Sequence, residues 1–209
     1  MNPAAHLAAA VMMAVLGMLA WLLGDHFLMN YTPRGQAGFE RIADVAYGGI
    51  STGFAVADIN RWSVPAGFEL LPLSDRPGQA SLTAASGQNG LSGELDWEEQ
   101  GVVWPLAQEY AHVFNGQRLR IRIEARAAML GPAPVELAVL FTSRQAGDSG
   151  WQVLELSEQF QTYSFEFRTP ELMQVEEVSP FLVLRPAGTG PENAVIVREA
   201  AVSLVPGDV

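Results

Sequence analysis

The densest group of chemistry-bearing side chains is acidic: Glu94, Asp96, Glu98 and Glu99 surround Trp97. Two carboxylates on one strand face are the residue types that glycoside hydrolysis requires, and the oxygens of Glu94 and Asp96 also suit Ca²⁺. A solvated acidic edge is the simpler interpretation in a chain of net charge −11. We therefore expect no catalytic residue here and keep one structural calcium ion as the alternative.

A second candidate for chemistry is the tetrad 147–150, Gly-Asp-Ser-Gly. A nucleophilic serine needs a histidine base and a buried aspartate that orients it. The chain has three histidines, of which His6 and His26 lie in or beside an apolar N-terminal run, so His112 is the one candidate base. The same tetrad suits a tight turn between strands. We predict a turn and a protein that is not an enzyme. The absence of cysteine also excludes thiol nucleophiles and thiolate metal sites.

Tryptophan and arginine offer binding chemistry instead. An exposed tryptophan can stack on a sugar ring or anchor a protein interface, and Trp97 and Trp104 are the candidates, with burial in the core as the alternative. Arg118, Arg120 and Arg122 alternate along one strand and form a stripe that is unusual in an acidic chain. Two interpretations stay open, a solvated face paired with acidic neighbours or a patch that docks an acidic partner through guanidinium forks.

Alternation of apolar and polar residues predicts the elements that must position these side chains. In residues 118–126 (RLRIRIEAR) every second residue is apolar, which is typical of a strand with one wet face. The segments 135–142, 161–168, 180–186 and 193–205 continue the series, with turn residues between them. We predict a mainly β fold, a single antiparallel β-sandwich of jelly-roll type over residues 39–209, with shorter strands and loops in 39–90.

The order of these pieces from 104 to 205 resembles the carbohydrate-binding modules and galactose-binding-like jelly-roll domains. The resemblance rests on Gln108, Asn115-Gly116, the strand 118–126, Trp151, the aromatic strand 163–167 and the closing strand 194–205. It implies a β-sandwich and, less directly, saccharide binding, because this fold hosts many functions. The closing strand reads Val-Arg-Glu-Ala where many members carry an Asp-Asn pair, so no ligand residue is transferred.

The first 24 residues carry no Asp, Glu, Lys or Arg, and 7–24 are all apolar or glycine. A helix over 1–24 is long enough to cross a membrane, which predicts a single-pass signal anchor, with a cleaved signal peptide as the alternative. Residues 25–38 are then a juxtamembrane linker. One stripe of this helix is predicted to pack against a partner helix: Ala10, Ala14, Gly17, Trp21 and Gly24.

These features predict location and partners. All 12 basic residues are arginine against 23 acidic ones, which argues against nucleic acid as a partner. We expect a bacterial inner-membrane protein with its N-terminus in the cytoplasm and its domain in the periplasm, in contact with the lipid bilayer. Two functions stay open. The first is an accessory subunit of a membrane assembly, respiratory or photosynthetic for example. The second is an anchored saccharide-binding module in envelope or exopolysaccharide metabolism. Neither requires a cofactor.

Overall fold

The computed structural model describes residues 46, 48–85, 99–129, 134–143, 147–175 and 178–206. The chain divides into two compact units, 1–41 and 42–209, and all described residues belong to the second. The described elements, in chain order, are β1 Ile50–Gly53, α3 Val56–Ile59, β2 Phe68–Pro72, β3 Ala80–Ala84, β4 Val102–Pro105, α4 Tyr110–Phe114, β5 Arg118–Ala127, β6 Glu136–Thr142, β7 Gln152–Glu155, β8 Gln161–Arg168, β9 Phe181–Pro186, the 3-10 turn η2 Pro191–Asn193 and β10 Val195–Leu204.

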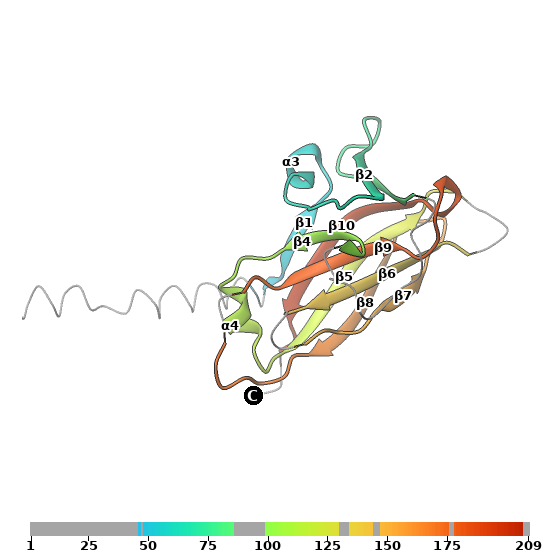
Figure 1. Cartoon of the computed structure of the whole chain (residues 1–209). Coiled ribbons are helices and arrows are strands. Elements are labelled where there is room, and N and C mark those ends of the chain that lie inside the picture. Colours follow the sequence, from blue (N-terminus) through green and yellow to red (C-terminus); the bar gives the residue numbers. More distant parts are fainter. Residues whose placement is uncertain are drawn as a thin grey trace, which may run out of the picture. The chain divides into compact units, whose positions relative to one another are not determined.

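The strands form two antiparallel sheets, and the fold is mainly β as the sequence predicts (Figure 1). The six-stranded sheet runs β2-β3-β10-β5-β8, with β1 also paired to β10, and the four-stranded sheet runs β4-β9-β6-β7. The long strands β5 and β10 pair over almost their whole length and form the centre of the larger sheet. Strand β8 is the edge next to β5. The outward-pointing side chains of the adjacent strands β8, β5 and β10 therefore lie on one face of the sheet.

One core lies between the two sheets, which makes them the layers of a β-sandwich. Strand β5 contributes Leu119, Ile121 and Ile123, which are at most 1% exposed, while the arginines between them face out, as the period-two pattern predicts. The opposite sheet contributes the inward side of β6 and β9, including Phe141 and Leu182, both fully buried. The alternation of β5 thus decides which side chains reach the outer surface of the six-stranded sheet.

The four-stranded sheet corrects one expectation. The pattern in 135–142 predicts a strand with one wet face, but Ala138 and Leu140, which point away from the main core, are fully buried as well. Leu140 belongs to a second cluster with Val103, Phe181 and Val183, against which Trp151 packs. The physical reason is this second layer of packing, and the composition agrees with it, since β6 and β9 are apolar at almost every position, as strands buried on both faces are.

Strand β10 carries a β-bulge at Arg198. Val197 pairs with Ala125 of β5 and Glu199 pairs with Glu124, so Arg198 is one extra residue on β10. The bulge coincides with a change of partner on the other edge of β10, where residues 195–197 pair with β3 and 199–202 pair with β1. The extra residue places the Arg198 side chain on the outer face, beside Glu124.

No helix within the described ranges is long and apolar enough to cross a membrane. The predicted anchor at 1–24 lies outside those ranges, together with its proposed packing stripe of Ala10, Ala14, Gly17, Trp21 and Gly24. The anchor and the linker 25–38 therefore stay predictions from the sequence.

Candidate functional site

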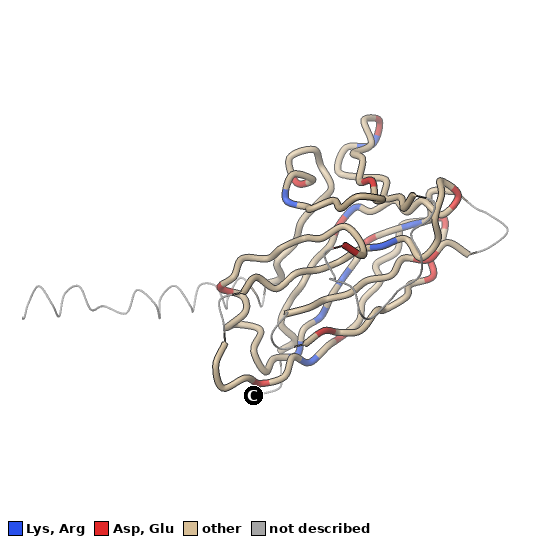
Figure 2. Tube along the Cα trace, viewed as in Figure 1, with Lys and Arg blue, Asp and Glu red and all other residues tan. Residues whose placement is uncertain are grey.

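The outer face of the six-stranded sheet gathers charged side chains of both signs. Figure 2 marks the basic positions in blue and the acidic positions in red along the chain trace. The predicted stripe lies here: the side chains of Arg118, Arg120 and Arg122 are 43%, 47% and 52% exposed. Their acidic neighbours come from β8 and β10, the two strands that flank β5. Within the chain, the contacts of the stripe are therefore those of a solvated face paired with acidic neighbours.

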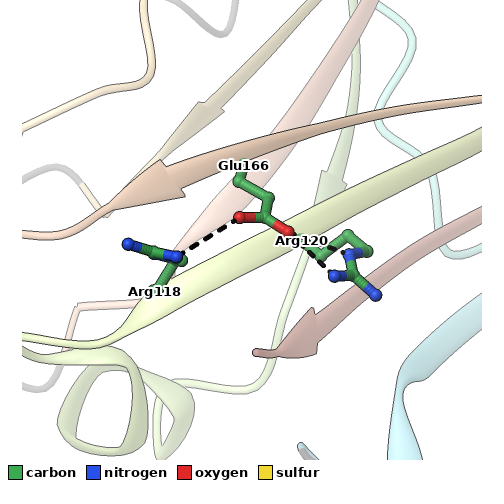
Figure 3. A network of polar contacts seen from close by, with 3 residues as sticks. All are labelled: Arg118, Arg120 and Glu166. Carbon is green, nitrogen blue, oxygen red and sulfur yellow. Dashed lines mark hydrogen bonds and ion pairs between the residues drawn. The ribbon is translucent and has the colours of Figure 1, made fainter. Parts of the chain in front are cut away.

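Glu166 on β8 joins two of these arginines (Figure 3). Its Oε1 accepts hydrogen bonds from Arg120 Nη2 at 2.8 Å and from Arg120 Nε at 3.2 Å. Its Oε2 lies 3.8 Å from Arg118 Nη1. Glu166 and Arg120 are directly opposite in the β5–β8 ladder, the position at which unlike charges stabilise a sheet. One carboxylate thus serves two guanidinium groups.

A hollow lies further along the same face, lined by Arg122, Glu124, Thr162 and Glu199. Its volume is about 160 Å³, below the range of roughly 300–1,000 Å³ that encloses a whole drug-sized ligand. Arg122 Nη2 is 3.6 Å from Glu199 Oε1 across the hollow. A cavity of this size, lined by two carboxylates, a guanidinium and a hydroxyl, suits one small hydroxyl-rich group.

Arg198 pairs with Glu124 at one side of this hollow. Arg198 Nε donates to Glu124 Oε2 at 2.9 Å, and Arg198 Nη2 donates to Glu124 Oε1 in a two-pronged contact. These hydrogen bonds are the main reason that the pKa of Glu124 lies below its ordinary value, and the charges of Arg198 and Arg122 add to the effect. The same contact raises the pKa of Arg198. Glu124 is therefore an anion that accepts hydrogen bonds at neutral pH.

Phe160 is the aromatic side chain beside the hollow. Phe160 comes directly before β8 and two positions before Thr162, so the alternation of the strand places its side chain on the same outer face, where it is partly buried. The guanidinium carbon of Arg198 lies 4.5 Å from the centre of the Phe160 ring, and that of Arg126 lies 5.3 Å from it. Phe160 is not among the site residues predicted from the sequence, although it continues the outward-facing alternation of β8 before the strand begins and is an aromatic residue among polar ones.

Trp104 is buried in the sandwich core and only 4% exposed, so the buried alternative applies to it. Its ring centre lies 6.0 Å from that of Trp62, which lies 5.0 Å from the ring of Phe54. The ring of Trp104 is therefore not accessible for stacking on a ligand. Trp97 lies outside the described residues, and its role as a ligand or interface candidate stays a prediction.

The tetrad 147–150 makes turn contacts. Asp148 Oδ1 accepts a hydrogen bond from the N–H of Gly150 at 2.8 Å, and both glycines of the tetrad have positive φ angles, 86° and 64°. Ser149 Oγ donates to the Gly150 carbonyl at 2.9 Å and accepts from the N–H of Phe141 at 3.0 Å. These contacts fit the predicted turn. The hydroxyl of Ser149 forms its hydrogen bonds with main-chain groups.

The calcium candidates Glu94 and Asp96 lie outside the described residues, so that site stays a prediction. Within the described ranges, no three acidic or histidine side chains converge in a way that could hold a metal ion.

Comparison with known proteins identifies the fold. No protein-family model matches the chain, and no curated protein sequence matches it. Among solved structures, the tandem CBM22-1–CBM22-2 domain of Paenibacillus barcinonensis Xyn10C is similar with a TM-score of 0.51 and 14% identity, over 76% of this chain and 46% of that one. The single CBM22-1 xylan-binding domain of the same protein has a TM-score of 0.51 and 13% identity, over 76% and 94% of the two chains.

The fold is that of a carbohydrate-binding module, which confirms the resemblance seen in the sequence. This chain spans less than half the length of the tandem domain and nearly all of the single one, which matches one module. At these identities the likeness shows the fold alone. A fold of this kind hosts many functions and does not by itself assign one to this chain.

Proposed function

We propose that this chain is a non-catalytic saccharide-binding module of jelly-roll type, and that it binds its ligand on the outer face of the six-stranded sheet. The observation that carries the proposal is the run of contacts between Phe160 and a hollow lined by Arg122, Glu124, Thr162 and Glu199. Arg198 joins the two, because it bonds Glu124 and lies over the Phe160 ring.

The chemistry of this face fits a sugar. A pyranose presents hydroxyl groups that donate and accept hydrogen bonds and an apolar C–H face that packs on aromatic rings. Carboxylates accept from such hydroxyls, while guanidinium groups donate to them, and both kinds of side chain line the hollow. The salt bridges of the face hold these side chains in fixed positions, which lowers the entropy lost on binding. The similarity to a module named for xylan binding adds support at the level of fold.

A binding titration tests the proposal directly. The full chain, purified in mild detergent, is titrated with a broad panel of neutral and acidic oligosaccharides. We expect Phe160→Ala to lower the affinity for the best ligand about tenfold, or about 1.4 kcal/mol. Met173→Ala is the matched control, because Met173 is a fully exposed apolar residue outside the strands. Absence of binding across the panel would overturn the proposal.

Membrane attachment is a separate proposal, supported by the uncharged segment 1–24. We expect the chain to stay with the membrane fraction after alkaline extraction and a C-terminal reporter that works only in the periplasm to be active. Release into the supernatant would contradict the anchor, and an inactive reporter would reverse the orientation. The role as accessory subunit stays a prediction, and recovery of the chain as a lone monomer from native membranes would contradict it.

A further inference from the structure

The charge of the outer face differs in sign from that of the chain. Counted over the described strand positions of this face, there are six arginines and four glutamates, a net charge of +2. They are Arg118, Arg120, Arg122, Arg126, Arg168 and Arg198, with Glu69, Glu124, Glu166 and Glu199. The whole chain carries −11. Half of its 12 basic residues therefore lie on one face of one sheet.

The glutamates beside β5 do not balance the arginines of that strand. Glu166 is shared between Arg118 and Arg120, and Glu124 is taken by Arg198. Arg122 reaches Glu199 only at 3.6 Å, longer than a charge-assisted hydrogen bond. Two of the six arginines, Arg126 and Arg198, lie at the end of β5 nearest Phe160.

Arg126 is at that end, and its surroundings favour an anion. Its Nη1 donates to the carbonyl of Ala127 at 2.8 Å, and its guanidinium lies over Phe160. No carboxylate among the described residues forms an ion pair with it. Partial burial, and secondly the charge of Arg76, lower the pKa of Arg126. A cation that is partly desolvated and close to a second cation gains from a carboxylate ligand.

We infer that the saccharide taken by this face is anionic, a chain that carries carboxylate groups, with its sugar ring beside Phe160 and one carboxylate on the guanidinium of Arg126. This inference rests on the proposed function and narrows it to uronic-acid-containing glycans. The guanidinium fork matches a carboxylate with two parallel N–H donors. The hollow next to it would take a hydroxyl-bearing part of the same ring or its neighbour.

Matched polymers separate this inference from the proposed function. Polygalacturonate and alginate are each titrated into the full chain in detergent beside their carboxyl-reduced forms, which keep the sugar backbone and lose the charge. We expect at least one uronate polymer to bind at least tenfold more tightly than its reduced form. Equal binding of both forms would overturn the inference and leave the proposed function intact. Binding of neutral glycans alone would do the same, and binding of no glycan would overturn both.

Substitutions of one arginine locate the carboxylate contact. We expect Arg126→Gln to lower the affinity for the uronate polymer about tenfold and to leave the affinity for a neutral glycan unchanged. The uronate affinity of Arg126→Lys should lie between those of the wild type and Arg126→Gln, because lysine keeps the charge and lacks the two-pronged guanidinium. Arg61→Gln, an equal change of charge on an exposed residue after α3, is the control and should change neither. Equal losses in Arg126→Gln and Arg61→Gln would overturn the contact. If polyglutamate binds as tightly as the uronate polymer, the inference that the ligand is a saccharide is overturned, and an acidic protein is favoured as the ligand.

Discussion

Glu166 Oε1 accepts two hydrogen bonds from the Arg120 guanidinium, at 2.8 and 3.2 Å, from the neighbouring strand of the six-stranded sheet. The contact is on the surface, with the two side chains 38% and 47% exposed. It holds Arg120 in place at the cost of covering part of its charge. Stability and binding should therefore respond to its loss in opposite directions.

We expect Glu166→Gln to lower the free energy of unfolding by only about 0.2–1 kcal/mol, as for exposed ion pairs generally. The same variant makes the face more positive and should bind a uronate polymer more tightly than the wild type, with no gain for a neutral glycan. Urea denaturation and titration with polygalacturonate measure the two effects. A loss of uronate affinity would show that Glu166 contacts the ligand itself.

The Arg198–Glu124 pair predicts a dependence of stability on pH. The pKa of Glu124 is lowered in the folded protein, so its contribution is present above the unfolded value of 4.5 and is lost as the pH falls through the folded value. We expect the stability difference between the wild type and Glu124→Gln to shrink below pH 4.5. Thermal unfolding from pH 7 to pH 3 measures it, and a difference that stays constant over this range would contradict the assignment.

Thr169 provides a test of a buried hydrogen bond. Its side chain is 1% exposed, and its Oγ1 donates to the carbonyl of Phe114 and accepts from the N–H of Gln117 at 3.1 Å. Thr169→Val keeps the shape and removes both of these hydrogen bonds, while the N–H of Gln117 still donates to the carbonyl of Phe114 at 3.1 Å. We therefore expect a loss of about 0.5–1.5 kcal/mol in the free energy of unfolding. Thr169→Ser keeps the hydroxyl and should lose less. Equal losses for the two variants would show that the methyl group matters more than the hydrogen bonds.

Gly101 tests the close approach of the chain to β9. A Cβ at this position would lie 2.6 Å from the carbonyl oxygen of Leu184 and 2.9 Å from a side-chain methyl of Val183. We expect Gly101→Ala to lower the free energy of unfolding by about 1–3 kcal/mol through overpacking. Gly48→Ala is the matched control, since a Cβ there meets nothing within 4 Å. Denaturation curves of the two variants that coincide would contradict this packing.

The long strands could be predicted because their alternation is strict. In β5, leucine and isoleucine face the core and arginine faces out at successive positions, so the sequence alone gives both the strand and its wet face. In β6 and β9 nearly every residue is apolar, and period two cannot show that both faces are buried. That property depends on what packs against the sheet, which local sequence does not encode.

The arginine stripe was predicted, but its surroundings were not. Glu166 and Glu199 come from strands that pair with β5 far along the chain, and the pairing register decides which acids meet which arginines. The contact between Arg198 and Glu124 further depends on a bulge, a one-residue irregularity in a strand whose pattern gives no local signal of it. By residue type alone, Trp104 could be an exposed stacking platform or a core residue. Its packing against Trp62 shows that it is a core residue, and that contact cannot be read from the sequence.

The bulge in β10 also has a mechanical consequence. On one side of β10 the partner is β5 throughout, but on the other side β1 holds residues 199–202 and β3 holds 195–197. Tension applied at the C-terminal end of β10 would load the β1 ladder before the β3 ladder, because the two are separated at Arg198. Along this edge the strand is thus divided into two segments with different partners, and the residue whose guanidinium lies over Phe160 stands at the joint between them.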